Sequence, residues 1–183
     1  RGYLAEVRLP DLRFTAAETH TFLRGCMKLP LDDEDIMRLE ARTEGWAAGL
    51  QLAALALQEA PSVNDRDAQK NFIARFSASH QYVLDFLTTE VLAHLPEESH
   101  QFLLQTSILK QLSGPLCQAV IGSSNSAEIL STLVRKNLFL IPLDTEGIWF
   151  RFHHLFAEML RMRLERLGAE AIAQLHLRAA TWY

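Results

Sequence analysis

The sequence of 183 residues contains little cysteine, no long apolar run and no excess of positive charge. Cys26 and Cys117 lie far apart and outside any C-x-x-C pattern, so we expect neither a disulfide framework nor a zinc ribbon. The most apolar segment, residues 47–57, is far shorter than the ~20 residues of a membrane span, and no secretory signal is visible. The net charge of −4 argues against a dominant nucleic-acid binder, which usually has a basic face. These features predict reduced thiols and a cytoplasmic location.

Catalytic motifs are missing as well. The sequence has no G-x-x-x-x-G-K-[ST] phosphate loop, no G-x-S-x-G elbow and no H-E-x-x-H motif. His154 and Glu158 are one helical turn apart and could share a metal ion, but two ligands do not complete the usual tetrahedral site. We therefore expect no enzyme and no metal site in this chain, and we expect both cysteines to be ordinary buried thiols.

What the first half does contain is a series of helix signals. The T-x-x-E pattern of Thr15 and Glu18 is a capping box that predicts a short helix ending near Gly25. Asp32 or Asp33 can cap the next helix. The following stretch, TEGWAAGLQLAALALQ, is apolar nearly all round, which is typical of a buried helix. The first half therefore predicts a helical bundle.

The second half has a different pattern. EAPSVNDRD is typical of an exposed loop, so we place a domain boundary between Pro61 and His80. Helices are then expected around residues 83–91, from 96 onward, over SGPLCQAVIG and over 126–136. LFLIPLDTEGIWFRF predicts two strands around a turn at residues 144–147, with Trp149, Phe150 and Phe152 in the second strand. Three helices followed by a hairpin is the order of a winged helix, and two more helices, 155–167 and 169–183, are expected after it.

Two histidines, His153 and His154, stand where the second strand gives way to a helix in WFRFHHLFAEML. A helix N-terminus leaves N–H groups unpaired and attracts anions, phosphate included. A histidine placed there can donate a ring N–H to a phosphate oxygen, and the local field favours its neutral form. The alternative is that both rings are packed and hydrogen-bonded to nearby backbone, which the residues alone favour.

The third helix of the predicted winged helix, Ser126 to Lys136, is where a DNA reader would contact bases. It has Arg135 and Lys136 only at its end, and Glu128 near its start. Base and phosphate contacts require Arg, Lys, Asn or Gln along the exposed face. This helix therefore favours a winged helix that packs against protein.

Five separated motifs carry a family resemblance: DLRFTAAET, TEGWAAGLQLAALAL, YVLDFLTTEVL, NLFLIPLD and FRFHHLFAEMLR. In this order and spacing the chain resembles the MalT-like, LuxR-type transcriptional regulators of the STAND class of NTPases. The resemblance implies a mostly α protein: a helical lid bundle over 1–79, then a winged-helix domain with a short β-hairpin over 80–167. Residues 168–183, ending in LHLRAATWY, are similar to the first helix of a superhelical sensor. We expect a piece of a longer protein.

The same resemblance implies roles for individual residues. Phe152-His153-His154-Leu155 is similar to the Met-His-Asp-Leu motif of related STAND proteins, which implies that His153 contacts the β-phosphate of ADP and holds the inactive state. His154 would then orient the loop. Gly45-Trp46-Ala47 matches the G-x-P motif, but Ala47 replaces the proline that packs on adenine, which leaves that contact to Trp46 and the backbone. Arg13, in the first motif, is a secondary candidate.

The function implied is a nucleotide-state-sensing control segment of an ATP-dependent transcriptional activator. Its cofactor would be ATP or ADP in the full-length protein, with weak or no binding by this segment alone. Its partners would be an upstream NTPase domain and a downstream sensor domain of the same chain, with self-association on activation, no direct DNA contact by this segment and no membrane. The alternatives are a helical protein-interaction module without a nucleotide role and, with less support, an autonomous DNA-binding winged helix.

Overall fold

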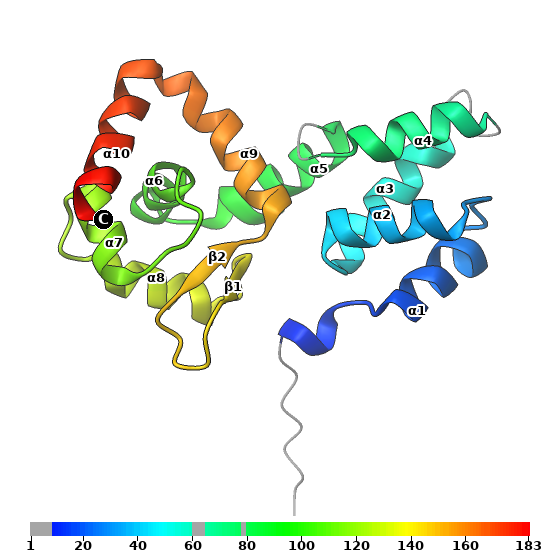
Figure 1. The fold of residues 1–183 in the computed structure, drawn as a ribbon, viewed down its shortest axis with the longest axis horizontal. Coiled ribbons are helices and arrows are strands. Elements are labelled where there is room, and N and C mark those ends of the chain that lie inside the picture. Colours follow the sequence, from blue (N-terminus) through cyan, green and yellow to red (C-terminus); the bar gives the residue numbers. More distant parts are fainter. Residues whose placement is uncertain (1–8, 60–64, 78–79) are drawn as a thin grey trace, which may run out of the picture. The chain divides into compact units, whose positions relative to one another are not determined.

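The computed structural model describes residues 9–59, 65–77 and 80–183. The chain divides into two compact units, Arg1–Val83 and Leu84–Tyr183, both drawn in Figure 1. The described residues are mostly helical and include one two-stranded antiparallel hairpin, which confirms the predicted fold class. Part of the predicted loop EAPSVNDRD, residues 60–64, lies outside the described residues.

The first unit is built from short helices in its described part. In chain order they are the 3-10 turn η1 (Leu9–Leu12), α1 (Ala16–His20), the π-helical turn η2 (Thr21–Cys26), α2 (Asp33–Thr43), α3 (Ala47–Glu59) and α4 (Arg66–Arg75). The predicted capping box is confirmed, because the Thr15 hydroxyl accepts the Glu18 N–H and the Glu18 carboxylate accepts the Thr15 N–H at 2.8 Å. A π turn continues α1, so the helical path reaches Cys26, close to the predicted end.

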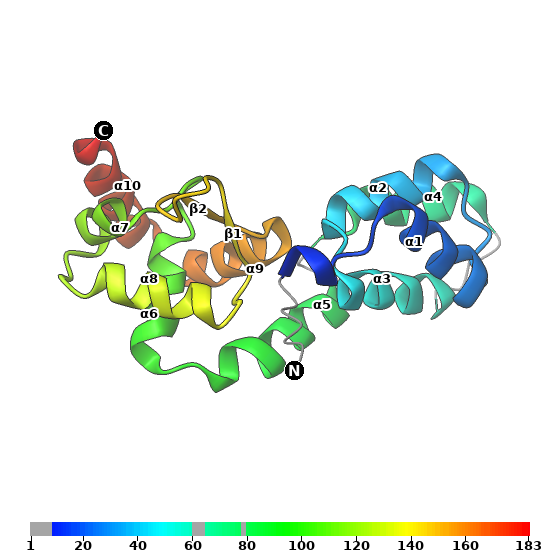
Figure 2. The same cartoon turned by 90° about the horizontal axis from the view of Figure 1, so that it is seen from below.

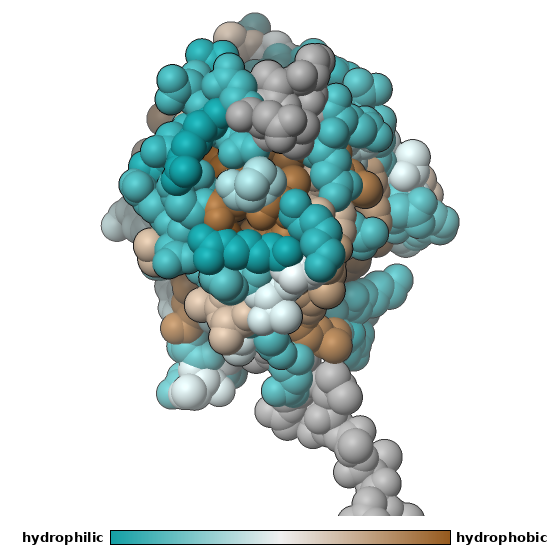
Figure 3. Space-filling model, turned by 90° about the vertical axis from the view of Figure 1, so that its right-hand side faces the viewer, coloured by the Kyte–Doolittle hydropathy of each residue, from teal (hydrophilic) through white to brown (hydrophobic). Residues whose placement is uncertain are grey.

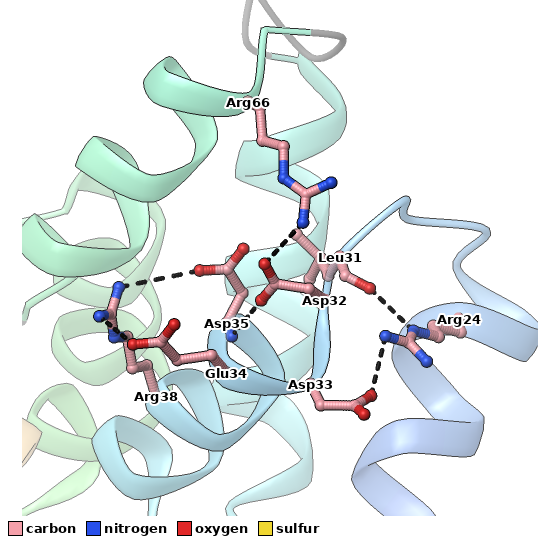
Figure 4. Close-up of polar contacts among 8 residues, drawn as sticks. All are labelled: Arg24, Leu31, Asp32, Asp33, Glu34, Asp35, Arg38 and Arg66. Carbon is pink, nitrogen blue, oxygen red and sulfur yellow. Dashed lines mark hydrogen bonds and ion pairs between the residues drawn. The ribbon is translucent and has the colours of Figure 1, made fainter.

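A network of ion pairs holds the start of α2 against its neighbours (Figure 4). Asp32 is the cap of α2 and accepts the Asp35 N–H at 2.9 Å, as predicted for this position. Arg66, in the first turn of α4, donates to the Asp32 carboxylate at 2.7 Å. Arg24 of η2 lies 2.9 Å from the Asp33 carboxylate. The hydrogen bond from the Asp35 backbone, together with Arg66, lowers the pKa of Asp32 to about 2. Three elements are thereby joined at one helix end.

The core of the first unit is formed around α3. Its buried side chains, which lie on more than one face as the sequence predicted, are Leu50, Ala53, Ala54, Ala56 and Leu57. The face of this unit seen in Figure 3 is covered mainly by hydrophilic residues, with hydrophobic side chains visible between them.

Helix α4 was not predicted from the sequence, where residues 61–80 were assigned to a loop and boundary. Asp65 caps α4 by accepting the backbone N–H groups of Asp67 and Ala68. Ile73 and Phe76 are buried, with 1% of each exposed. The polar composition of this segment gave no helix pattern, although its cap, the buried Ile73 and the buried Phe76 just after its end stabilise a helix.

The second unit contains the remaining elements. They are α5 (Gln81–Phe86), which contains the division between the units, η3 (Leu87–Val91), η4 (Leu92–His94), α6 (Glu97–Thr106), α7 (Gly114–Ile121), α8 (Ser126–Arg135), β1 (Leu140–Pro142), β2 (Phe150–Phe152), α9 (His154–Leu164), η5 (Glu165–Leu167) and α10 (Ala169–Trp182). Helices α6, α7 and α8 pack against one another (Figure 2). Three packed helices followed by a hairpin is the predicted winged-helix order.

The hairpin is the wing of this domain. Leu140 pairs with Phe152 and Pro142 with Phe150, and Phe150 also bridges to Leu112. The prediction that Trp149 belongs to the second strand is wrong. The Asp144 carboxylate accepts the backbone N–H of Trp149 at 2.9 Å, which keeps that residue in the loop.

The core of the second unit lies between α9 and the three packed helices. Its fully buried side chains include Leu103, Leu116, Leu133, Leu155 and Phe156. Helix α10 packs on α7 through Leu175 and Ala179, which are also buried. In the described part of the chain, no helix combines the length and apolarity needed to cross a membrane.

Candidate functional site

The two histidines occupy the junction between β2 and α9, as the sequence predicted. His153 precedes the first residue of α9, and its carbonyl accepts the Ala157 N–H at 2.9 Å, which closes the first turn. His153 is only 4% exposed, whereas His154 is partly exposed. The two rings stack with centroids 5.0 Å apart and planes 14° apart. The junction therefore presents His153 at the positive end of a helix, in a buried setting.

Phe139 holds His153 in place, a role that the sequence did not reveal. The Phe139 carbonyl accepts the His153 N–H at 2.8 Å, and the two rings meet edge to face at 5.8 Å. The Phe139 ring also stacks on Phe156 of α9 at 5.1 Å. Phe139 adopts a left-handed φ of 55°, which costs a side-chain-bearing residue about 1–2 kcal/mol. Packing around the junction compensates for that local strain.

The second set of candidate residues joins α2 to α3 in the first unit. Gly45 has a left-handed φ of 71°, and its carbonyl accepts the Phe14 N–H at 2.8 Å. A Cβ on Gly45 would lie 2.5 Å from the Phe14 carbonyl oxygen, so only glycine fits this close approach. Trp46 pairs with Arg13 in an isolated antiparallel bridge, and Ala47 is the first residue of α3. The structure thus brings Arg13, Gly45 and Trp46 together.

Trp46 packs against the first turn of its own helix. A Cβ on Gly49 would lie 2.4 Å from Trp46 Cε3, so the six-membered half of the indole occupies the space above that glycine. The Trp46 carbonyl accepts the Leu50 N–H at 3.0 Å. Packing therefore accounts for both glycines of G-W-A-A-G, and part of the Trp46 side chain remains exposed.

Arg13 forms a further contact with the end of α2. Its guanidinium lies 4.0 Å from the Glu44 carboxylate, and Glu44 itself has a left-handed φ of 50°. The sequence did not predict this pair, because Arg13 and Glu44 are 31 positions apart and carry no common motif. Residues 13 and 45–47 belong to the first unit and residues 153–154 to the second.

The cysteines differ from each other. Cys117 is fully buried in α7, and burial raises the pKa of its thiol to about 12, so it stays protonated at neutral pH. Cys26 is exposed at the end of η2. The prediction that both are buried is therefore wrong for Cys26, which is the last residue of a π turn and lies outside the core.

The second unit has the fold of a winged-helix domain, and comparison with known proteins identifies its kind. Residues 88–172 match the MalT winged helix domain. The HTH-type transcriptional regulator MalT of Serratia proteamaculans is 36% identical over 180 residues, which cover 98% of this chain and 20% of that protein. MalT of Yersinia enterocolitica is 34% identical over the same shares.

Serine/threonine-protein kinase PknK of Mycobacterium tuberculosis is also 36% identical over 180 residues, 98% of this chain and 16% of the kinase. The chain thus spans a fifth or less of the length of these relatives. Residues 88–172 thus belong to the MalT winged-helix family, and nearly the whole chain is similar to MalT regulators, as the five sequence motifs predicted.

Proposed function

We propose that this chain is the nucleotide-state-sensing control segment of a cytoplasmic, ATP-dependent MalT-like transcriptional activator. In this proposal ADP bound by an upstream NTPase domain holds the protein inactive, and exchange for ATP releases it and permits self-association. The observation that carries the proposal is the placement of His153 directly before α9. There a ring N–H and the first-turn backbone N–H groups can serve the same phosphate.

Phe139 would be responsible for the geometry of this contact. Because it fixes both the backbone and the ring of His153, the imidazole needs little ordering when a phosphate binds. Because His153 is only 4% exposed, a phosphate oxygen reaches it only after a small local rearrangement. His154, more exposed and stacked on His153, would support the ring.

The first unit would contribute a packing surface for the adenine base of the nucleotide. The proposal gives this role to the exposed part of Trp46, since Ala47 offers only a methyl group where related proteins have proline. The Arg13–Trp46 bridge and the Phe14–Gly45 hydrogen bond would hold the indole in position. Since neither unit contains a phosphate loop, we expect this segment alone to bind nucleotide weakly or not at all.

The test is the ADP affinity of the full-length protein carrying His153→Ala. Loss of one hydrogen bond to a charged phosphate removes about 1.5–3 kcal/mol, or roughly a ten- to hundred-fold loss of ADP affinity. Transcription without inducer should rise because the inactive state is weakened. His154→Ala should have a smaller effect on both quantities.

Because His153 is buried, its replacement can also disturb packing, so the experiment needs a matched variant. His153→Gln keeps an N–H donor and should retain more ADP affinity than His153→Ala at similar thermal stability. Equal losses for the alanine and glutamine variants, in step with their stabilities, would assign His153 to packing alone. Unchanged ADP affinity in His153→Ala would reject the proposed role.

A further inference from the structure

An open groove runs along α8 in the second unit. Its floor is one stripe of the helix, formed by Ala127, Leu130, Ser131, Val134 and Arg135, and its volume is about 600 Å³. These residues recur at helical spacing and extend over ~12 Å of the helix axis. Four of the five are uncharged, and the fifth, Arg135, lies at the C-terminal end of α8. A DNA-reading helix would carry polar contacts along such a stripe, whereas this one is largely uncharged.

The wing forms one wall of this groove and also projects as a convex tip. Phe150 and Ile148 line the groove, and Ile148 is nevertheless 49% exposed. Figure 1 shows the loop between β1 and β2 extending from the unit. The loop is held in shape by Asp144, whose carboxylate accepts the N–H groups of Ile148 and Trp149. Leu143, also in the loop, is 43% exposed. Each copy of the chain thus has a concave groove and, on the loop beside it, a convex tip with two exposed apolar side chains, Leu143 and Ile148.

The charges on these two surfaces are complementary. Glu146 lies at the exposed tip of the wing, whereas Arg135, the last residue of α8, lines the groove and is followed by Lys136. Within one copy, none of these three side chains forms an ion pair with any residue that the structure describes. Arg135 only donates to the Thr132 hydroxyl of its own helix, at 3.1 Å. A second copy can supply the missing partners.

We propose that two copies of this chain associate reciprocally, each inserting the tip of its wing, residues 143–148, into the α8 groove of the other. A two-fold axis then places Glu146 of each copy beside Arg135 of its partner copy, and Ile148 against the apolar floor. Closed two-fold pairs are the commonest form of self-association, and a self-complementary surface is what they require. The contact is small, so we expect weak, reversible association.

This inference rests on the self-association in the proposed function, for which it names the surface, but not on nucleotide binding. If activation exposes the wing and α8, the pair would form only in the active state. The association of the 183-residue chain is measurable directly by sedimentation equilibrium over a range of concentrations.

Charge reversal provides the decisive experiment. Glu146→Lys and Arg135→Glu should each weaken self-association at least about tenfold, because both ion pairs of the dimer become repulsive. In an equimolar mixture of the two variants, the substituted side chains carry opposite charges and meet at one of the two contacts, while the unchanged Arg135 and Glu146 form the other pair. The mixture should therefore associate about as well as the wild-type chain.

Glu165→Lys is the control, because Glu165 is exposed, outside the groove, and undergoes the same change of charge. It should leave association unchanged, whereas Ile148→Asp should abolish it, with circular dichroism confirming the fold in each case. A wild-type chain that remains monomeric, or a mixture no stronger than its components, would overturn the inference. Either result alongside an intact His153 effect on ADP affinity would leave the nucleotide proposal standing.

Discussion

Replacing Gly49 by alanine tests whether Trp46 is fixed against α3. Alanine in a helix interior normally stabilises by about 1 kcal/mol relative to glycine. Here the new Cβ would lie 2.4 Å from Trp46 Cε3, so the indole must retreat by roughly 1 Å or more to restore ordinary contact. Overpacking of this kind costs about 1–3 kcal/mol. We therefore expect Gly49→Ala to destabilise the chain by up to about 2 kcal/mol.

The same substitution should have the opposite sign when the indole is absent. In a Trp46→Ala background no ring meets the new Cβ, so Gly49→Ala should stabilise by about 1 kcal/mol. The coupling energy of the double-mutant cycle is then about 1–3 kcal/mol, well above the ~0.5 kcal/mol scatter of independent sites. This number measures how firmly the ring is held against the helix.

Urea unfolding of the four proteins gives the cycle. Far-UV circular dichroism follows both units in all four proteins. In the two proteins that carry Trp46→Ala, the remaining tryptophans, Trp149 and Trp182, both lie in the second unit, so the fluorescence of that pair reports on the second unit alone. In that pair, a change seen by dichroism but not by fluorescence therefore belongs to the first unit. If Gly49→Ala stabilises the wild-type chain as much as the Trp46→Ala chain, the indole does not occupy this position and the packing described above is wrong.

Two further predictions concern the first unit. Gly45→Ala should lower the free energy of unfolding by about 2–4 kcal/mol, because strain at φ 71° adds to a clash with a backbone oxygen. Gly122, with φ 81° and open space around it, is the control, and Gly122→Ala should cost only about 1–2 kcal/mol in the same urea titration. Equal costs for the two substitutions would contradict the clash at Gly45. Asp35 is 1% exposed, and its pKa is raised by burial and then by the charge of Asp32, so ionisation opposes folding above the usual value of 3.8. Asp35→Asn should therefore raise the melting temperature at pH 7, and this gain should vanish as the pH falls toward 3.8. Asp33→Asn, at a carboxylate that is 77% exposed, is the control and should change the melting temperature little. A lower melting temperature of Asp35→Asn at pH 7 would show that the Arg38 ion pair outweighs the cost of burial.

Local signals explain why most elements could be predicted. The capping box of Thr15 and Glu18 and the helix cap at Asp32 each depend on residues within one turn, and each is present in the structure. Helix α4 was missed because Ile73 is its one fully buried apolar residue and Phe76 follows only after its end, too few positions to give a periodic pattern. Trp149 was misassigned because its side chain favours a strand while its backbone N–H is taken by Asp144.

The candidate site was less accessible to sequence reasoning. The position of the histidines follows from a strand-to-helix change that the residues show directly. Their burial and the support from Phe139 depend on packing between residues that are 14 positions apart, which no local pattern encodes. The α8 groove is similar, since its floor and its wall come from different elements. The sequence shows a largely uncharged stripe on α8 but not that the wing lies beside it.

The left-handed Phe139 has an evolutionary consequence. A glycine at this position would relieve the backbone but remove the ring that contacts both His153 and Phe156. Backbone strain and ring packing therefore select in opposite directions at one position. Substitutions there would change the orientation of His153 while leaving both histidines in place. Substitutions at position 139 can thus change the orientation of the His153 ring in small steps during evolution, whereas replacing His153 itself removes the ring altogether.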